Sequence, residues 1–424
     1  MPFNSQTLED SPFRGEPDWL RDRRRTAFAA YERLPMPSRT DEEWRRTDVT
    51  QFKPAAYAQF ESPNGHAHGA PLTDVAGWIR HDGRVYTSLD HKSGNLDNPL
   101  GHVILEPLAI AARNHKALIE PRLFSLAQSD RDHFTALHSA FFTGGTFLYV
   151  PEGVVIDQPI VSQHFSHKGG TSVLPHTVIV AGRGARFSFL DEYIGEEDEE
   201  AAYRSGSAEI FVGEGADVSY VSIQKWGRKA WHLADQRARL EKDARLRLFN
   251  VTLGGHFSKT RVEASLVGPG SSAELKGIYL ASGKQFFDFH TLQDHQVGNT
   301  TSDLLFKGAL QDTAKAVYAG LIRIEKGAAR SDAYQANRNL VLSEHAKATS
   351  IPMLEIDNND VRCTHGATVG PVDPMSMFYL QSRGIPATTA KRMIVQGFFG
   401  EVLERIPFEQ ARKLVETELE ARLG

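Results

Sequence analysis

The residues best suited to metal or nucleophile chemistry are Cys363 and His365, within the segment 362–370. If this segment is a β-strand, residues two apart project from the same face, so the thiol and the imidazole are neighbours. Such a pair can supply ligands to iron or zinc, and it can also form a cysteine nucleophile with a histidine base. Two ligands do not close a metal site, so a metal role requires a partner chain or an external thiol. The alternative is a buried, apolar cysteine beside a histidine satisfied by the backbone.

Other polar residues are interpreted as structural. The acidic stretch 192–200 is a solvated loop or a weak cation site. The remaining histidines of interest are His164, His167, His176, His290 and His295, whose register is open, and His66 and His68 in a loop-like segment. No P-loop or GxGxxG turn is present, so we expect no ATP hydrolysis by this chain alone. Cys363 lacks an identifiable orienting acid or oxyanion group for catalysis on its own.

The chain has 424 residues and an ordinary globular composition, with 41% hydrophobic and 24% charged residues. A net charge of −5 argues against a dedicated nucleic-acid binder. No stretch approaches the roughly 20 apolar residues of a membrane helix, and the acidic N-terminus lacks a secretory pattern. The single cysteine excludes an intrachain disulfide or an all-cysteine metal site. It indicates a reducing compartment, so we expect a cytoplasmic protein.

The middle of the chain is predicted to be β-structure, because short β-branched and aromatic segments alternate with turn residues from about Phe147 onward. Small residues enter four of these segments at intervals of 31, 28 and 29 residues. They are Ala185, Ala216, Ala244 and Ala273. The segment 306–308 also repeats 275–277 after 31 residues. This spacing favours the stacked coils of a solenoid, with a jelly roll or β-sandwich as the competing interpretation.

Helical periodicity marks both ends. An apolar stripe near the N-terminus predicts an amphipathic helix that ends before Pro35, with the arginines of 21–25 on its solvated face. The stripe consists of Trp19, Leu20, Ala27, Phe28 and Tyr31. Near the C-terminus, a helix capped by Thr388 or Thr389 and a second helix after Pro407 predict a hairpin. This hairpin would serve as an end cap or a docking surface.

Several motifs make the chain similar to the SufB/SufD family of iron–sulfur cluster assembly proteins, and in particular to its SufD branch. They are Asp41–Asp48, Ser331–Leu340, Arg362–Gly370, Met377–Ile385 and the segment Gly397–Pro407. The resemblance implies a mainly β fold, a right-handed parallel β-helix flanked by helical regions, which agrees with the solenoid prediction. The expected boundaries are a largely helical region at 1–138, a β-helix core at 139–366 and a C-terminal helical domain at 367–424.

The resemblance also implies a non-enzymatic scaffold subunit of a SufB–SufC–SufD complex. Such a chain pairs with a SufB-like paralogue, and each of the two binds a SufC-like ATPase through its C-terminal helices. ATP binding by SufC is thought to open a cluster-building site at the SufB–SufD interface. No cofactor is then bound by this chain alone, and a nascent iron–sulfur cluster or iron lies between the two subunits.

The same resemblance distinguishes the two paralogues. SufB-like chains carry His-Glu where this chain has His365-Gly366, and an essential cysteine where Asn337 aligns. We therefore infer that His365, with Cys363 second, faces the partner's thiolate and carboxylate in a shared metal site. Two other functions stay open at this point: a β-helix polysaccharide lyase or hydrolase, and an inert structural module that binds partners. A homodimer of the isolated chain is also open.

Overall fold

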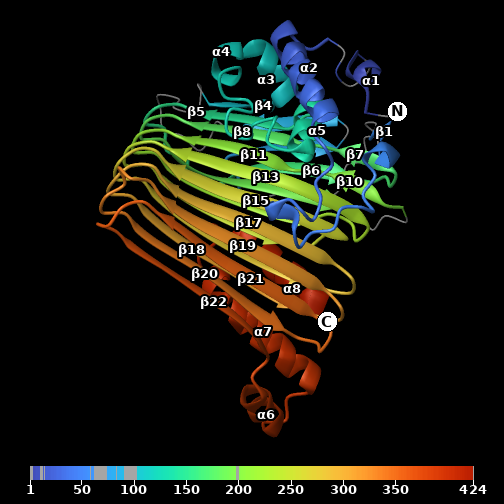
Figure 1. Cartoon of the computed structure of the whole chain (residues 1–424), viewed down its shortest axis with the longest axis vertical. Helices are drawn as coiled ribbons and strands as arrows, with labels where there is room; N and C mark the ends of the chain where they lie inside the picture. Colours follow the sequence, from blue (N-terminus) through green and yellow to red (C-terminus); the bar gives the residue numbers. More distant parts are fainter. Residues whose placement is uncertain are drawn as a thin grey trace.

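The computed structural model describes residues 3–9, 13, 15–57, 59–61, 74–82, 84–89, 103–196 and 200–423, so His66 and His68 lie outside the described residues. These residues form a parallel β-solenoid with helices at both ends (Figure 1). The mainly β solenoid prediction is confirmed. The sandwich interpretation is wrong, because strands one coil apart pair in parallel along the length of the solenoid.

Each coil of the solenoid contributes one strand to each of two sheets, here called sheet A and sheet B. Sheet A has the order β21-β19-β17-β15-β13-β11-β8-β5-β4, with β1, β7 and β10 beside this path, and sheet B has the order β22-β20-β18-β16-β14-β12-β9-β6-β2-β3. The strands of sheet A are β1 (Gln59–Phe60), β4 (Ile104–Pro107), β5 (Thr146–Val150), β7 (Thr171–Val173), β8 (His176–Ala181), β10 (Ala202–Arg204), β11 (Ser207–Val212), β13 (Ala230–Leu240), β15 (Phe257–Leu266), β17 (Phe286–His295), β19 (Lys315–Ile324) and β21 (Lys347–Ile356). Those of sheet B are β2 (Gly77–Asp82), β3 (Arg84–Leu89), β6 (Ile160–Ser166), β9 (Arg186–Gly195), β12 (Asp217–Lys225), β14 (Arg245–Thr252), β16 (Ser272–Ala281), β18 (Thr301–Leu310), β20 (Asp332–Val341) and β22 (Arg362–Pro371).

The inner faces of the two sheets enclose one apolar core, and the repeated alanines lie within it. Ala185, Ala216 and Ala244 are fully buried and stack in register, as the intervals predict. Ala273 is buried too, but it pairs with Leu246 and lies two residues from the expected position. Because side chains alternate with a period of two, a shift of two residues preserves the buried face. The predicted burial is confirmed, whereas the predicted register of the fourth repeat is wrong.

The N-terminal helices cover the first coils (Figure 1). They are α1 (Ser5–Glu9), α2 (Asp18–Arg33), η1 (Glu42–Trp44), η2 (Pro54–Tyr57), α3 (Leu108–Asn114), α4 (Lys116–Ile119) and α5 (His133–Phe141). The region expected to be largely helical also holds the short strands β1 to β4. In α2 the apolar stripe packs inward, as predicted, but Arg24 is buried as well. Its guanidinium pairs with Glu16 at 2.7 Å and lies 3.7 Å from the Phe142 ring, so the solvated interpretation is wrong for this arginine.

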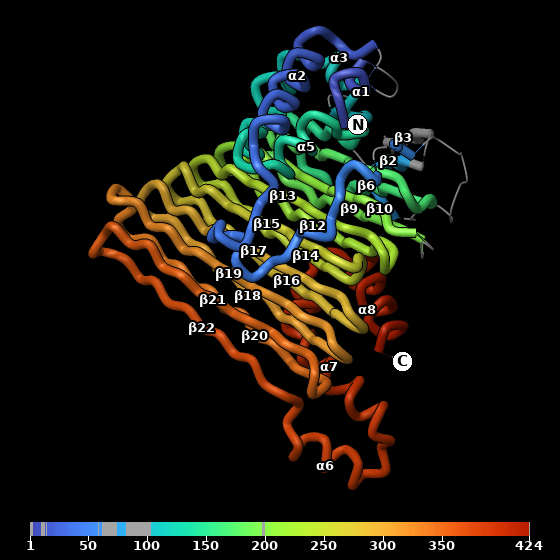
Figure 2. The backbone as a smooth tube through the Cα atoms, turned by 45° about the vertical axis from the view of Figure 1, so that its right-hand side comes forward, coloured from blue at the N-terminus to red at the C-terminus, as the bar shows by residue number. Residues whose placement is uncertain are grey.

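Three helices follow the last coil: α6 (Pro374–Ser382), α7 (Ala387–Leu403) and α8 (Glu409–Leu423). Figure 2 shows α6 projecting beyond the last strands, while α7 and α8 lie against the coils. Their apolar residues pack on the outer face of sheet B. Helix α7 begins after Pro386 without a side-chain cap, so the predicted threonine cap is wrong. Strand β22 continues to Pro371, past the expected boundary at 366. Within the described ranges, no helix is long and apolar enough to cross a membrane.

Candidate functional site

Cys363 and His365 lie on β22, the last strand of sheet B, whose single neighbour is β20. Cys363 pairs in register with Ala333, and His365 pairs with Gln335. Both residues of β20 are buried in the interior of the solenoid, so the two side chains of β22 share the inner face of the terminal coil. The prediction that these two residues are neighbours on one strand face is confirmed.

Cys363 is half-buried and packs beside Ile322, Ile324 and Ala333. Partial burial raises the pKa of the thiol, and the negative charge of Asp332 raises it further. At neutral pH the side chain is therefore a neutral thiol, whereas the thiolate is the metal ligand and nucleophile. The local surroundings do not activate Cys363, and a metal or a cationic partner must displace its proton.

His365 is exposed at the open end of the solenoid. In the part of the chain that the structure describes, its ring makes no hydrogen bond or ion pair, and no three His, Cys, Asp or Glu side chains converge as a metal site. Neutral imidazole is a good ligand for iron or zinc. His365 can thus supply one ligand to a site that a second molecule completes.

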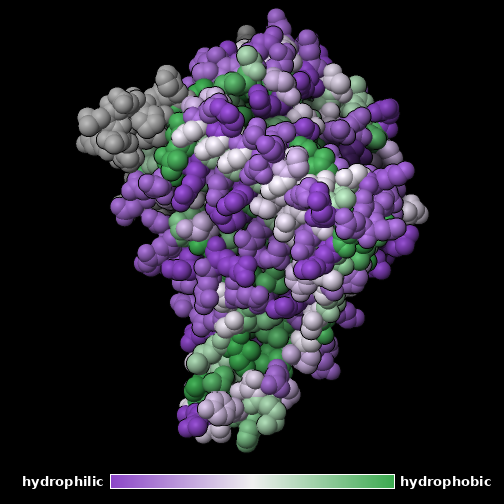
Figure 3. Space-filling model, turned by 90° about the vertical axis from the view of Figure 1, so that its left-hand side faces the viewer, coloured by the Kyte–Doolittle hydropathy of each residue, from purple (hydrophilic) through white to green (hydrophobic). Residues whose placement is uncertain are grey.

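The terminal coil leaves both of its strands as sheet edges, because among the described strands β21 pairs only with β19 and β22 only with β20. Large apolar side chains are exposed along these two strands, among them Leu354 and Ile356 on β21 and Val369 on β22. Apolar surface gathers toward this narrow lower end of the molecule (Figure 3). Unpaired strand edges with exposed apolar side chains are typical of surfaces that add further strands from another chain.

Asn337, where the resemblance implies an essential cysteine in SufB-like chains, does not lie on this edge. It is buried on β20, donates to the Phe306 carbonyl at 3.2 Å and accepts from Asn339 at 2.7 Å. Its register partner on β22 is Ala367. This position therefore serves a buried hydrogen-bond network one coil below the open edge.

Five of the other histidines have internal partners, as their structural interpretation predicts: His164, His167, His176, His290 and His295. His164 Nε2 lies 3.0 Å from Asp191, and His295 bonds to Thr300 and Ser302 at 2.7 Å. His164 and His176 do not form a cluster, because His164 contacts Asp191 whereas His176 contacts His138 and Glu209.

The sequence reasoning missed a buried chain of hydrogen bonds that joins α5 to sheet A. Ser205 Oγ lies 2.9 Å from His138 Nδ1, His138 Nε2 lies 3.1 Å from His176 Nδ1, and His176 Nε2 lies 3.0 Å from Glu209. Burial and the neighbouring His176 lower the pKa of His138 well below its ordinary value. Ser205 and Glu209 are near each other, but His138 and His176 are far from them and from one another in sequence, so no local motif could have revealed the chain.

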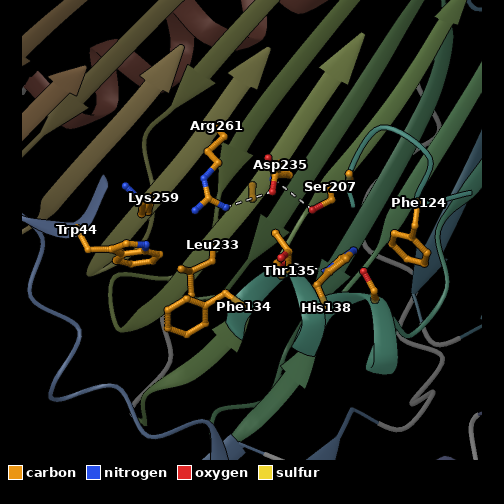
Figure 4. Close-up of a pocket in the computed structure, with 14 residues that line it drawn as sticks. Trp44, Phe124, Phe134, Thr135, His138, Ser207, Leu233, Asp235, Lys259 and Arg261 are labelled. Atoms are coloured by element: carbon orange, nitrogen blue, oxygen red, sulfur yellow. Dashed lines mark hydrogen bonds and ion pairs between the residues drawn. The ribbon is translucent and has the colours of Figure 1, made fainter. Parts of the chain in front are cut away.

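A small cavity lies between the N-terminal segment and sheet A, beside Trp44, His138, Asp235, Lys259 and Arg261 (Figure 4). Arg261 points toward Asp235, with Nη1 3.4 Å from its carboxylate. Burial raises the pKa of Asp235 to about 7, although Arg261 opposes the shift. The cavity volume is about 30 Å³, and a water needs about 10–15 Å³, so this space is large enough for water but too small for a sugar.

Acidic residues group beside this cavity. Asp235 and Glu263 lie on adjacent strands and both pair with Arg237, at 3.1 and 2.9 Å. The N-terminal segment covers the group, because Glu43 pairs with Arg261 at 2.8 Å. Asp235 is buried, Glu263 is half-buried, and both are paired with arginine, which does not favour a polysaccharide lyase or hydrolase.

Helix α6 carries a second apolar surface near the open edge. Met375, Phe378 and Tyr379 are 70%, 65% and 58% exposed, and α6 has no buried residue. Asp373 caps the helix through the N–H groups of Met375 and Ser376. A capped helix with exposed aromatic residues is typical of a protein-binding surface.

Comparison with known proteins agrees with this architecture. The family model described as SUF system FeS cluster assembly, SufBD core domain, matches residues 164–398, and that of the SufBD protein N-terminal region matches residues 83–161. The iron–sulfur cluster assembly protein SufD of Bacillus subtilis is 28% identical over 96% of this chain and 95% of its own length. A SufBD family protein of Mycobacterium tuberculosis is 36% identical over 51% of this chain and 57% of its own. The chain belongs to the SufBD family of iron–sulfur cluster assembly proteins.

Proposed function

We propose that this chain is a SufD-type scaffold subunit that pairs with a SufB-like paralogue through the open edge of its solenoid. The observation that carries the proposal is the position of His365 on an unpaired edge strand, exposed and without an internal partner in the described chain. Family membership and the apolar residues around this edge support it. A SufB-like chain would add strands to β21 and β22 by the same parallel pairing that joins the coils.

In this proposal His365 supplies one ligand to a nascent iron–sulfur cluster or iron, and the paralogue supplies the thiolate and carboxylate. Cys363 is the second candidate ligand, and its raised pKa places it behind His365. The chain itself is a non-catalytic scaffold in the cytosol.

The test uses the complex co-expressed with its SufB-like and SufC-like subunits. His365→Ala should lower cluster yield about tenfold or more, since a missing ligand weakens the site strongly, while all three proteins still copurify. His345→Ala is the matched control, because His345 is an exposed histidine in the turn between β20 and β21. Normal cluster yield from the His365→Ala complex would refute the metal role.

We also propose that α6 forms the docking surface for the SufC-like ATPase. Phe378→Ser should reduce ATPase binding about tenfold, since full burial of a phenylalanine is worth about 1.5–3 kcal/mol. Ile110→Ser is the control, because Ile110 is an exposed apolar residue of α3 at the opposite end of the molecule. The affinity of each variant for the ATPase is measured by calorimetry. Equal affinities would show that α6 is not the docking surface.

An isolated chain with this open edge is also compatible with a homodimer. Sedimentation of the purified protein over a range of concentrations distinguishes the homodimer from a monomer that waits for its paralogue.

A further inference from the structure

Lys307 on β18 has an unusual set of partners. Its side chain is only 6% exposed, and its ammonium lies 2.6 Å from Glu401. The same Nζ donates to the Phe398 carbonyl at 2.8 Å and lies 5.0 Å from the Phe398 ring. All of these groups belong to α7. In the described chain, no group of the solenoid itself accepts a hydrogen bond from this buried ammonium.

Lys276 on the neighbouring strand β16 provides the contrast. It is buried to a similar extent, but it pairs with Asp303 on β18 at 2.6 Å and lies 3.6 Å from Glu274 on its own strand. The charge of Lys276 is therefore compensated within sheet B. The charge of Lys307 is compensated only when α7 lies in its observed place.

Apart from the contacts of Lys307, the Glu401–Arg338 pair and a hydrogen bond from Lys391 to the Leu342 carbonyl at 2.9 Å, the contact between α7 and sheet B is largely apolar. Val395, Phe399 and Val402 of α7 belong to the same buried cluster as Leu305 of β18 and Ala336 of β20. Apolar contacts are not directional, so they stabilise a docked helix without fixing its position along the outer face of the sheet. A buried charge must meet its counter-charge, and single buried polar pairs are known to select one register in helix packing.

Glu401 also connects α7 to the strand next to the open edge. Its carboxylate lies 3.1 Å from Arg338 of β20, and Arg338 is the register neighbour of Lys307. Strand β20 in turn pairs with β22. Glu401 thus joins α7 to the two strands that precede Cys363 and His365 in sheet B.

We propose that Lys307 and Glu401 are a positioning pair that fixes the register of α7 on sheet B. The pair thereby places α6, which directly precedes α7, at a defined distance from the edge that carries His365. The importance of this distance rests on the proposed function, in which α6 and the edge serve one assembly. The register itself is a property of the isolated chain.

The first measurement is hydrogen exchange of the full-length chain. Glu401→Leu leaves the Lys307 ammonium buried without a carboxylate, so the amides of α7 should exchange about a hundredfold faster, which corresponds to about 2.8 kcal/mol at 1.4 kcal/mol per factor of ten. Glu404→Leu is the matched control, because Glu404 is an exposed glutamate at the end of the same helix. The double variant Lys307→Met/Glu401→Leu should restore exchange to within about fivefold of wild type, since an apolar pair replaces the buried charge. Equal exchange in the Glu401→Leu and Glu404→Leu variants would overturn the proposal.

The second measurement separates register from stability. Spin labels are placed at Thr364→Cys on β22 and Met393→Cys on α7 in a Cys363→Ala background, and their distance distribution is recorded. The charged pair should give one narrow distance. The double variant Lys307→Met/Glu401→Leu should give a broadened distribution, or one shifted by about one helical turn of 5.4 Å. A single unchanged distance in this variant refutes the positioning role. Failure of the proposed function would show separately, as normal cluster yield in the His365→Ala complex.

Discussion

The buried pair of Lys259 and Asp288 makes a sharp test of how the N-terminal segment is held on sheet A. Lys259 lies on β15, Asp288 lies on β17, and their charged atoms are 2.6 Å apart with both side chains buried. Thr47 donates to the same carboxylate at 2.5 Å, and the Lys259 ammonium donates to the Glu43 carbonyl at 3.1 Å. The ammonium also lies 4.7 Å from the Trp44 ring. The perturbation is Lys259→Met, which keeps the length of the side chain and removes its charge.

The structure sets both the size and the pH dependence of the effect. Removing one partner of a buried ion pair costs about 3–5 kcal/mol. The buried Asp288 carboxylate would then keep only Thr47 and His290 as partners. Burial alone would raise the pKa of Asp288, but Lys259 and His290 outweigh burial and hold it below its ordinary range. In the variant this carboxyl should have a raised pKa, so it regains a proton in acid. The loss of stability should therefore be largest near pH 7 and should shrink as the pH falls toward 4.

Equilibrium urea unfolding of wild type and variant at pH 7 and pH 5 measures this loss. Lys53→Met is the matched control, since Lys53 is an exposed lysine of the same segment and should cost less than about 0.5 kcal/mol. Adding Asp288→Asn to Lys259→Met should recover part of the loss, because the uncompensated charge is gone. A loss below about 1 kcal/mol, or one that does not depend on pH, would show that the pair does not hold the segment.

Two further predictions concern the solenoid. Gly254→Ala should destabilise the protein by about 3 kcal/mol, since an added Cβ would lie 2.1 Å from the Trp226 carbonyl oxygen. The control is Gly327→Ala, whose added Cβ meets no atom within 4 Å and should leave the melting temperature nearly unchanged. Burial lowers the pKa of His232 to about 3, so the folded state resists a proton that the unfolded state binds below pH 6.5. The free energy of unfolding should therefore fall between pH 7 and pH 5 by about 2 kcal/mol more in wild type than in His232→Asn. The asparagine keeps an acceptor for the Trp226 N–H. Equal pH slopes of the two proteins in urea unfolding would contradict this prediction.

The sequence predicted which side chains point inward better than it predicted which coil they meet. The alanine intervals reveal a solenoid because each coil repeats one strand–turn pattern, but turns of different length change the offset between strands. The repeated segment placed Lys307 opposite Lys276 in the strand register, yet the register partner of Lys276 is Leu305. A shift of two residues leaves the face unchanged and is invisible to a pattern with a period of two.

Residues whose roles depend on contacts distant in sequence could not be predicted in the same way. Arg24 belongs to a charged run that is typical of a solvated helix face. Only its contacts with Glu16 and the Ala140 carbonyl explain its burial. Similarly, Asp235 and Glu263 form an acidic group only because β13 and β15 pair in register. Cys363 and His365 could be placed on one face because they are two residues apart on one strand.

The relative importance of Cys363 and His365 follows from where the solenoid ends. Cys363 is covered by the side chains of the preceding coil, which stabilise its neutral thiol. His365 lies farther along the same strand over Gln335 and is open to solvent. A neutral thiol must lose its proton before it binds a metal ion. Partial burial and the need to lose a proton thus both count against Cys363 as a ligand, which is why the proposed site is built on His365.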